Sequence, residues 1–204
     1  MPRTAVPLDP VRETRLLDVA ATAFTEVGYE PASLNHIIGE AGLAKSSFYH
    51  YFPDKQRLHD HVVLTLRDRL SRGLRLPDLD SLSADSYWPA MTAVLSSMAS
   101  TLSTDPQTLL LVRMFHHPLA ARGPDGQLTS LRAEVATWVA HAVAVGRQLR
   151  VLRHDVPDSL LTDLAVGILT VLTRWAPEHE KEYDHWPELA TQLLLDTLSQ
   201  AREP

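Results

Sequence analysis

Cysteine is absent from the 204-residue chain, which excludes disulfide bonds and metal sites built on thiolates. The chain also lacks any run of about 18 uncharged apolar residues, the pattern that marks a membrane-spanning helix. Residues 1–10 lack the apolar segment of a secretory signal. Together these absences predict a cytoplasmic protein without a membrane span.

Lysine and aromatic residues are both scarce: the chain has three lysines, and Phe, Trp and Tyr make up 6% of it. Both kinds nevertheless gather in the segment AGLAKSSFYHYFPDKQRL, residues 41–58, where a run of rings lies between Lys45 and Lys55. A buried core would favour the rings without the lysines, and a solvated face would favour the reverse. A surface that contacts a flat, negatively charged partner favours both. The alternative is ordinary core rings beside ordinary surface lysines.

The net charge of −6 is unevenly distributed. Residues 1–75 contain ten basic and nine acidic residues, a net charge of +1, whereas residues 76–204 contain nine basic and sixteen acidic residues, a net charge of −7. A small surface for nucleic acid needs only a few well-placed cations. An acidic protein can therefore carry such a surface in its first third.

Apolar spacing predicts four helices in the first 75 residues, at 10–28, 33–41, 44–51 and 54–75. We expect Gly28 to end the first helix, Ser33 and Asp54 to cap the second and fourth, and Gly42 to form a tight turn. The first helix has an apolar stripe at three- and four-residue intervals, made of Leu17, Ala20, Ala21, Phe24 and Val27.

The rest of the chain has the same helical periodicity, interrupted by polar and Pro-containing segments at 76–86, 116–126 and 176–187. Further helices are expected at 87–103, 105–116, 127–153, 158–176 and 187–201. Since no segment alternates as a strand does, we predict an all-α fold of about nine helices. The predicted domains are an N-terminal three-helix domain, 1–58, and a larger helical domain, 76–204, with the helix 54–75 as connector.

Two short helices joined by a glycine-containing turn and preceded by a supporting helix form a helix-turn-helix, which places its second short helix in the major groove of DNA. We expect Leu43 and Phe48 to point inward and Phe52 to close the exit of that helix. The outward face would then carry Lys45, Ser46, Ser47, Tyr49 and His50. These side chains can donate to guanine edges, contact phosphates or pack on a thymine methyl group.

Ser33 offers a hydroxyl and free backbone N–H groups to a phosphate, and Lys55 would contact the other flank. The segment SLNHIIGEAGLAKSSFYHYFPDKQRL, Ser33 to Leu58, resembles the signature of the tetracycline-repressor (TetR) family of bacterial transcription regulators. The features that carry the resemblance are the capping hydroxyl of Ser33, the Ala41–Gly42 turn, the FYHYF sequence and Lys55.

The resemblance covers about residues 12–58. It implies a homodimer in which each subunit has a small DNA-reading domain and a larger helical domain that binds a ligand and pairs with its twin. It further implies that the operator is contacted by Ser33, Asn35, Lys45, Ser47, Tyr49, His50 and Lys55. Ala44 departs from the pattern, because many members have a capping Ser or Thr there. The start of this helix would therefore lack a cap or a phosphate contact.

Two predicted helices near the C-terminus carry apolar stripes that would form a four-helix bundle with a second copy. The stripes include Leu161, Leu164, Ile168, Leu172, Trp175, Leu189 and Leu193. The alternative is that the stripes pack within their own domain.

Large, adaptable or polar-tipped side chains between residues 87 and 153 are candidates for a pocket that binds a hydrophobic or aromatic small molecule. They are Trp88, Met91, Met98, Met114, Phe115, Trp138 and His141. Each of them alone is also compatible with a plain core position.

The chain has ten histidines, but those beyond residue 100 lie in separate segments without the spacing of a known metal site. They include His116, His117, His141, His154, His179 and His185. We therefore predict no metal and no cofactor. The sequence also has no Gly-rich phosphate loop, nucleophile elbow or paired acid–base arrangement, so we predict that the protein is not an enzyme.

The sequence thus predicts a ligand-responsive transcription regulator, a repressor that binds a palindromic operator as a homodimer and is released by a small hydrophobic effector. One rival is a small-molecule-binding or scaffold protein that keeps the helix-turn-helix only as a fold. A second rival, an enzyme in the larger domain, would need convergent titratable groups.

Overall fold

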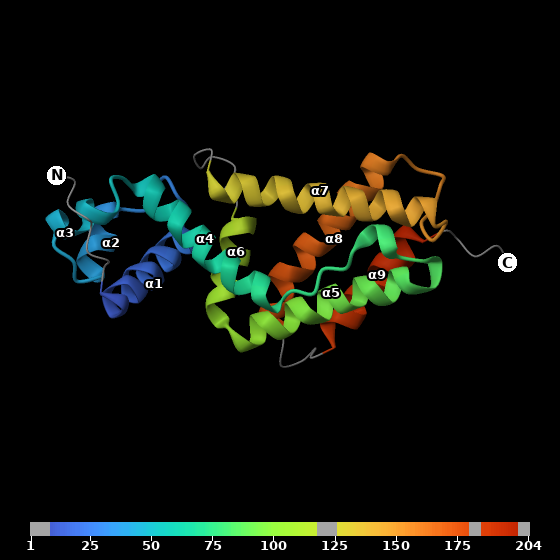
Figure 1. The fold of residues 1–204 in the computed structure, drawn as a ribbon, viewed down its shortest axis with the longest axis horizontal. Helices are drawn as coiled ribbons and strands as arrows, with labels where there is room; N and C mark the ends of the chain where they lie inside the picture. Colours follow the sequence, from blue (N-terminus) through green and yellow to red (C-terminus); the bar gives the residue numbers. More distant parts are fainter. Residues whose placement is uncertain (1–8, 118–125, 180–184, 200–204) are drawn as a thin grey trace. The chain divides into compact units, whose positions relative to one another are not determined.

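The computed structural model describes residues 9–117, 126–179 and 185–199. Within these ranges the chain forms α-helices and a short 3-10 helix at Leu79–Ser81, but no strand; Leu152 and Ser199 make an isolated antiparallel bridge. The predicted all-α class is therefore confirmed. The helices are α1 (Pro10–Val27), α2 (Leu34–Glu40), α3 (Lys45–Tyr51), α4 (Lys55–Gly73), α5 (Ala84–Thr104), α6 (Pro106–His116), α7 (Gln127–Gln148), α8 (Asp158–His179) and α9 (Trp186–Leu198) (Figure 1).

The chain divides into two compact units. The first combines residues 1–69 with residues 107–130, and the second combines residues 70–106 with residues 131–204. Sequence reasoning assigned α6 to the C-terminal domain, whereas its contacts place it in the first unit: Thr25 of α1 donates a hydrogen bond to the carbonyl of Leu110, 3.3 Å away. The functional division into a DNA-reading and a ligand-binding domain stays a prediction.

The core of the first unit fixes the positions of its short helices. α2 packs against both α1 and α3 (Figure 1). Burial of a large apolar side chain contributes roughly 1.5–3 kcal/mol, so a handful of such side chains holds a seven-residue helix that would be unstable alone. The fully buried side chains include Leu16, Phe24, Ile37, Ile38, Phe48, Leu58, Leu111 and Met114.

The inward stripe of α1 differs in two places from the predicted one. Leu16, which was not predicted, is buried, whereas the predicted Leu17 is only half-buried. Val27 is 45% exposed, although Phe24 one turn earlier is buried. The reason is that Val27 is the last residue of the helix, where the chain turns away at Gly28 with a φ of 85°. The predicted role of Gly28 in ending the helix is confirmed.

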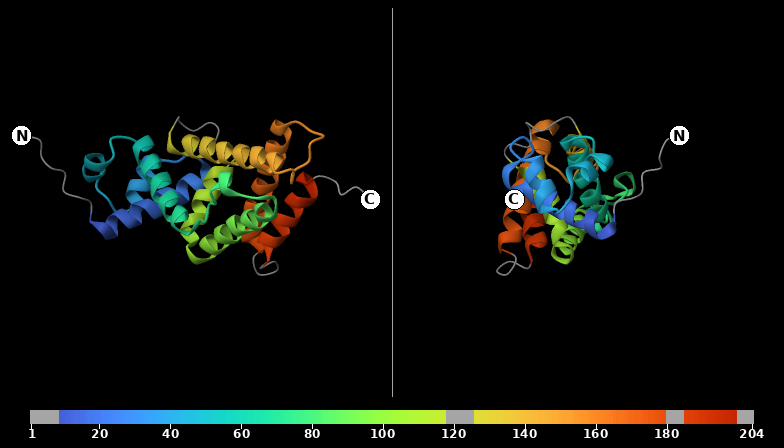
Figure 2. Two further views of the ribbon diagram at one scale, coloured as in Figure 1. Left: turned by 45° about the vertical axis from the view of Figure 1, so that its right-hand side comes forward. Right: turned by 90° about the vertical axis from the view of Figure 1, so that its left-hand side faces the viewer.

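The second unit is a bundle in which α9 packs against both α5 and α8 (Figure 1, Figure 2). Its core is almost wholly aliphatic and aromatic, because each helix contributes one apolar face. The buried members include Tyr87, Leu95, Val143, Leu152, Leu161, Leu172, Ala190 and Leu194.

α7 ends at Gln148, five residues before the predicted end at residue 153. Arg150 takes a left-handed backbone conformation with a φ of 58°. The N–H groups of Val151 and Leu152 then both donate to the carbonyl of Gly146, which closes the helix. Apolar periodicity continues through Val151 and Leu152, which is why the sequence alone placed the end too late.

α8 contains one segment, Asp158–Ala176, that is long and apolar enough to cross a membrane by length and composition alone. This is weak evidence, because a helix of a soluble protein passes the same test. Asp163 and Arg174 interrupt the segment, in agreement with the expected absence of an uncharged run. Several apolar side chains of α8, among them Leu160, Leu164 and Val171, are exposed.

Candidate nucleic-acid interface

The turn between α2 and α3 is held by backbone hydrogen bonds and a cap. The Ser33 hydroxyl accepts a hydrogen bond from the N–H of His36, 3.3 Å away, so the predicted cap is confirmed. At the other end of α2, the N–H groups of Gly42 and Leu43 donate to the carbonyls of Gly39 and Ile38 at 2.9 and 3.1 Å. Gly42 has a φ of 68°, a conformation that disfavours residues with a Cβ. The turn therefore requires the glycine that the sequence provides.

α3 turns one side inward. Phe48 is fully buried and Leu43 nearly so, as predicted. The ring of Phe48 lies 5.6 Å from the ring of Phe52, which in turn lies 5.3 Å from the ring of His61 on α4. This row of rings ties the end of α3 to α4, in agreement with the predicted position of Phe52.

The opposite side of α3 is exposed. All five residues predicted to point outward do so: Lys45, Ser46, Ser47, Tyr49 and His50. Tyr49 has 51% of its surface accessible, a large fraction for a tyrosine. A cation, two hydroxyls, a phenol and an imidazole therefore share one solvent-facing edge. Their predicted contact with DNA stays a prediction.

Ser33 and Asn35, at the first turn of α2, are also exposed. Because the Ser33 oxygen accepts the capping hydrogen bond, its own proton remains available for donation. Ala44, at the start of α3, makes no side-chain capping hydrogen bond, as expected from its residue type. The first turn of α3 therefore begins without the side-chain acceptor that a Ser or Thr would supply.

Lys55 has an intramolecular role that the sequence did not indicate. Its ammonium group donates to three carbonyl oxygens between α1 and α2: those of Tyr29, Glu30 and Ala32, at 2.8, 3.0 and 3.2 Å. It also lies 4.5 Å from the centroid of the Tyr29 ring. These bonds use all three donors of the ammonium group. Lys55 thus fixes the approach to α2, and its predicted DNA contact stays a prediction.

His59 of α4 is a buried residue that sequence reasoning missed. Its ring meets the rings of Phe24 and Tyr29 edge-on, at centroid distances of 4.9 and 5.2 Å. Its Nδ1 atom is buried without a hydrogen-bond partner. Burial away from water lowers the pKa of His59 to about 4, so the ring is neutral at pH 7.

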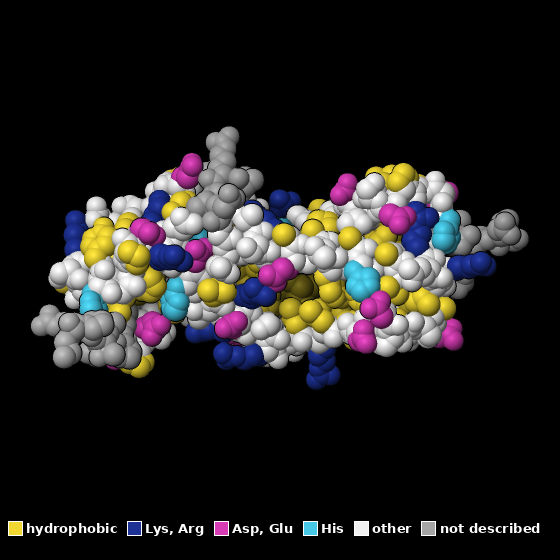
Figure 3. Space-filling view, turned by 45° about the horizontal axis from the view of Figure 1, so that its top comes forward, with side chains coloured by type: hydrophobic (Ala, Val, Ile, Leu, Met, Phe, Trp, Pro, Cys, Tyr) yellow, Lys and Arg dark blue, Asp and Glu magenta, His cyan; other side chains and the backbone are white. Residues whose placement is uncertain are grey.

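A cavity of about 70 Å³ lies in the second unit, between α5, α7, α8 and α9. Three of the seven predicted pocket residues line it: Trp88, Met91 and Trp138. The hydroxyl of Tyr87, another lining residue, donates to the carbonyl of Ala142, 3.0 Å away. None of the lining residues is charged. On the face drawn in Figure 3, apolar side chains gather around a hollow.

The other four predicted pocket residues do not line this cavity. Met114 is buried in the core of the first unit, and Phe115 follows it on α6. Met98 is half-buried farther along α5. His141 is exposed, and its Nε2 atom lies 3.0 Å from a carboxylate oxygen of Asp80. Residue type alone does not reveal which face of a helix looks into a cavity, and this explains the four misplacements.

The predicted dimer residues on α8 lie on two different faces. Leu161 and Leu172 are 0% and 6% exposed and belong to the core of their own unit, so their assignment to a dimer surface was wrong. Leu164 is exposed, and Ile168 and Trp175 are half-buried. On α9, Leu193 is exposed and Leu189 half-buried. Sequence reasoning missed two exposed residues of α8, Leu160 and Val171, because it followed the inward stripe.

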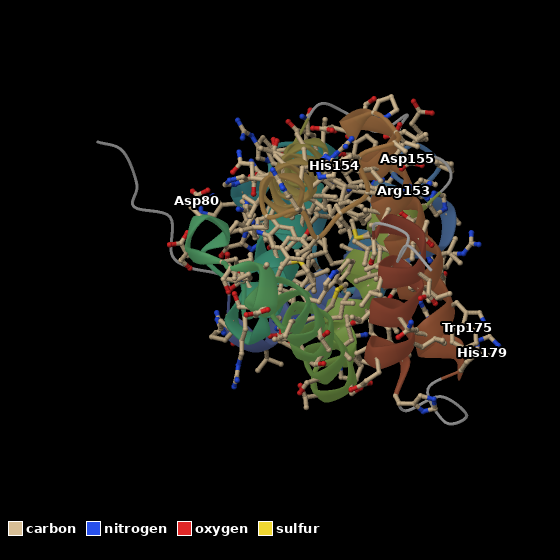
Figure 4. The ribbon with its side chains drawn as sticks, turned by 90° about the vertical axis from the view of Figure 1, so that its right-hand side faces the viewer. Asp80, Arg153, His154, Asp155, Trp175 and His179 are labelled. Carbon is tan, nitrogen blue, oxygen red and sulfur yellow. The ribbon has the colours of Figure 1, made fainter. Side chains whose placement is uncertain are left out.

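No group of three or more His, Asp or Glu side chains in the described ranges is arranged to hold a metal ion. His154 is exposed beside an ion pair between Arg153 and Asp155 (Figure 4). His179 stacks on Trp175 with a centroid distance of 4.3 Å.

Comparison with known proteins supports the resemblance. The family model described as "Bacterial regulatory proteins, tetR family" matches residues 16–62. The HTH-type transcriptional repressor KstR2 of Rhodococcus jostii is 37% identical over 59 residues, 29% of each chain. The HTH-type transcriptional regulator BetI of Serratia proteamaculans is 30% identical over 91 residues, 45% of this chain and 46% of its own. The matches to the first three curated relatives span 29%, 54% and 46% of those proteins.

Likeness in fold extends over nearly the whole chain. The crystal structure of a TetR family transcriptional regulator from Chloroflexus aurantiacus superposes with a TM-score of 0.71 and 19% identity, covering 95% of both chains. At that identity the similarity shows the fold alone. The family model covers the helix-turn-helix described above, from α1 into α4. Residues 16–62 of the chain are therefore similar to the TetR family of bacterial regulatory proteins, and the fold of nearly the whole chain is similar to that of a TetR family regulator.

Proposed function

We propose that the protein is a cytoplasmic transcription regulator that represses by occupying a palindromic operator as a homodimer and leaves it when a small hydrophobic effector binds. The observation that carries this proposal is the exposed edge of α3, held outward because Phe48 is buried on the opposite side. The match of residues 16–62 to the TetR family model supports the same function.

The edge of α3 has the donors that duplex DNA requires. The Lys45 ammonium can donate to the O6 and N7 acceptors of guanine or to a phosphate, and Ser47 can donate or accept. Tyr49 and His50, which are exposed, would contact phosphates or a thymine methyl group. Ser33 and Asn35 would fix the register by contacting a phosphate near the start of α2.

A palindromic operator follows from twofold symmetry. Two copies of α3 would enter successive major grooves about one helical turn apart, or slightly more. The exposed apolar residues of α8 and α9, Leu160, Leu164, Val171 and Leu193, support pairing with a second copy. An effector in the apolar cavity would release the DNA by binding more tightly to a conformation with the wrong spacing between the two α3 helices.

The proposal is tested by measuring DNA affinity of variants at several salt concentrations. Duplexes are first selected from a random-sequence library by the wild-type protein. Lys45→Ala should then weaken binding about tenfold or more and reduce the slope of log affinity against log salt by about two, because each subunit loses one cation. Arg72→Ala, which removes an exposed cation from α4, is the matched control.

The two variants separate the proposed function from its rival. A protein that keeps the helix-turn-helix only as a fold would select no duplex, or would bind with the same affinity in both variants. Effector release is tested on the selected duplex by adding small uncharged hydrophobic compounds. If no compound that binds the protein changes DNA affinity, the release step is wrong while DNA binding stands.

A further inference from the structure

Lys55 joins the two ends of the helix-turn-helix. The segment that contains α2, the turn and α3 ends at Asp54, and Lys55 follows as the first residue of α4. The Asp54 carboxylate accepts a hydrogen bond from the N–H of Arg57, 2.8 Å away, which fixes the backbone there. The ammonium group of Lys55 reaches the other end of the segment and donates to the carbonyl of Ala32. It therefore closes a loop of more than twenty residues at its base.

The acceptors of this ammonium group lie in the turn between α1 and α2. They are the carbonyls of Tyr29, Glu30 and Ala32, at 2.8, 3.0 and 3.2 Å, and we call the three hydrogen bonds the Lys55 clasp. In the described part of the chain, no backbone N–H group donates to any of these carbonyls. Pro31, within the same turn, has no N–H group to offer. The lysine thus supplies hydrogen bonds that the turn does not receive from the backbone.

The ring of Tyr29 connects the clasp to the core of the first unit. The Lys55 ammonium group lies 4.5 Å from the centroid of this ring. The ring in turn lies 6.0 Å from the ring of Phe24 and 5.2 Å from that of His59, measured between centroids. Phe24 and His59 are both buried. The core therefore holds one side of the clasp in place.

The clasp ends one residue before the cap of α2. Ser33 follows Ala32, and its hydroxyl accepts the hydrogen bond from the N–H of His36. Asn35 lies in the same first turn and is exposed. The two side chains proposed to contact an operator phosphate, Ser33 and Asn35, therefore leave from a backbone that Lys55 fixes.

We infer that Lys55 is a positioning residue for DNA binding, which places Ser33 and Asn35 by clamping the turn before α2 and does not itself contact a phosphate. All three protons of its ammonium group are donated within the chain, so a phosphate would have to displace a carbonyl. The effect on DNA rests on the proposed function. The rival is that Lys55 leaves the carbonyls and contacts a phosphate when DNA is present.

The salt dependence of DNA binding separates these two roles. Lys55→Met removes the charge and keeps an unbranched side chain. It should weaken binding to the selected duplex about tenfold, because the start of α2 loses hydrogen bonds to a charged group. The slope of log affinity against log salt should keep its wild-type value. A slope reduced by about two, as expected for Lys45→Ala, would show that each subunit has lost a phosphate contact and would overturn the inference.

Lys55→Arg tests the same point without changing the charge. A guanidinium group binds phosphate at least as well as an ammonium group, so a phosphate contact would keep the affinity within about threefold. Its planar fork cannot direct three N–H groups from one atom to three converging carbonyls. The clasp therefore predicts a loss close to that of Lys55→Met, and wild-type affinity would contradict it. Arg57→Lys, the reverse exchange at an exposed cation of the same turn, is the control and should bind as the wild type does.

Hydrogen exchange in the absence of DNA tests the clasp by itself. The N–H groups of His36 and Ile37 donate to Ser33, and in Lys55→Met they should exchange about tenfold faster or more. The amides of Val63 in α4 and Val143 in α7 should exchange as in the wild type. Unchanged exchange in α2 would refute the clasp, and faster exchange at all four positions would show that Lys55 stabilises the whole fold instead of positioning α2.

The exchange measurement also keeps this inference distinct from the proposed function. If the wild-type protein selects no duplex, the proposed function fails, whereas exchange in α2 still decides whether Lys55 holds that helix. If DNA is bound and Lys55→Met changes only the salt slope, the proposed function stands and the positioning role is wrong.

Discussion

At the scale of single residues, the two lysines of the aromatic segment have different structural positions. Lys45 is exposed on the outward edge of α3, whereas Lys55 donates to three carbonyls beside α2. Burial lowers the pKa of Lys55, and the negative charge of Glu30 acts in the opposite direction. Lys55, whose ammonium group donates to backbone carbonyls, can support a DNA-binding surface by fixing the helices that form it. Lys45, which is exposed, can contact the nucleic acid itself.

His59 leads to a prediction about acid stability. Its pKa is about 4 in the folded protein and near 6.5 in an unfolded chain, so only the unfolded state takes up the proton between these values. The free energy of unfolding should therefore fall by about 3 kcal/mol as the pH decreases from 6.5 to 4. His59→Phe keeps the ring contacts and should lose this pH dependence.

Urea unfolding at a series of pH values measures the effect. Comparing the slopes of stability against pH, rather than the stabilities themselves, removes any packing difference between His and Phe. Equal slopes for the two proteins would show that His59 does not hold a neutral ring in the fold.

At the scale of secondary-structure elements, α3 is short and begins without a side-chain cap. Its position depends on Phe48, which is buried between neighbouring helices, and on the turn at Gly42. A seven-residue helix has little stability of its own, so tertiary packing supplies most of it. The missing cap is therefore a local weakness in an element that the proposed function depends on.

Ala44→Ser should strengthen that element. A serine at the cap position can accept a hydrogen bond from the first turn, which typically adds about 1 kcal/mol. For a chain of this size, that gain should raise the unfolding temperature by about 2–4 °C. Ala44→Val, which offers no acceptor, is the control for the change in side chain. Circular dichroism during heating measures both, and equal temperatures for the serine and valine variants would contradict the capping argument.

At the scale of the whole molecule, the apolar cavity predicts the chemical class of its ligand. Its lining contains no charged residue, and the hydroxyl of Tyr87 is already donated to Ala142. A carboxylate or an ammonium group would be desolvated there without a partner, at a cost of several kcal/mol. The uncharged probe 1-octanol should therefore raise the unfolding temperature and change tryptophan fluorescence, whereas octanoate and octylamine at equal concentration should do much less.

Two of the four tryptophans, Trp88 and Trp138, line the cavity, which makes the fluorescence change assignable. Replacing both with Phe should abolish the change while leaving the thermal shift in place. Replacing Trp175 with Phe should leave both responses intact, because Trp175 lies outside the lining. Stronger stabilisation by octanoate than by 1-octanol would refute the uncharged ligand class.

The sequence by itself determined the features that depend only on residues close together in the chain. Caps and turns at Ser33, Gly28 and Gly42, and the inward and outward sides of α3, follow from residue type and helical spacing, which act over one or two turns. Tertiary structure decided which apolar residues are buried, because a helix with apolar residues on several sides can bury only some of them. On α8, Leu161 and Leu172 are buried in the core of their own unit, whereas Val171 is exposed. Likewise, Lys55 donates to three carbonyls that lie more than twenty positions earlier in the chain. Only the folded arrangement of the helices brings these residues together, so the sequence alone did not predict the contact.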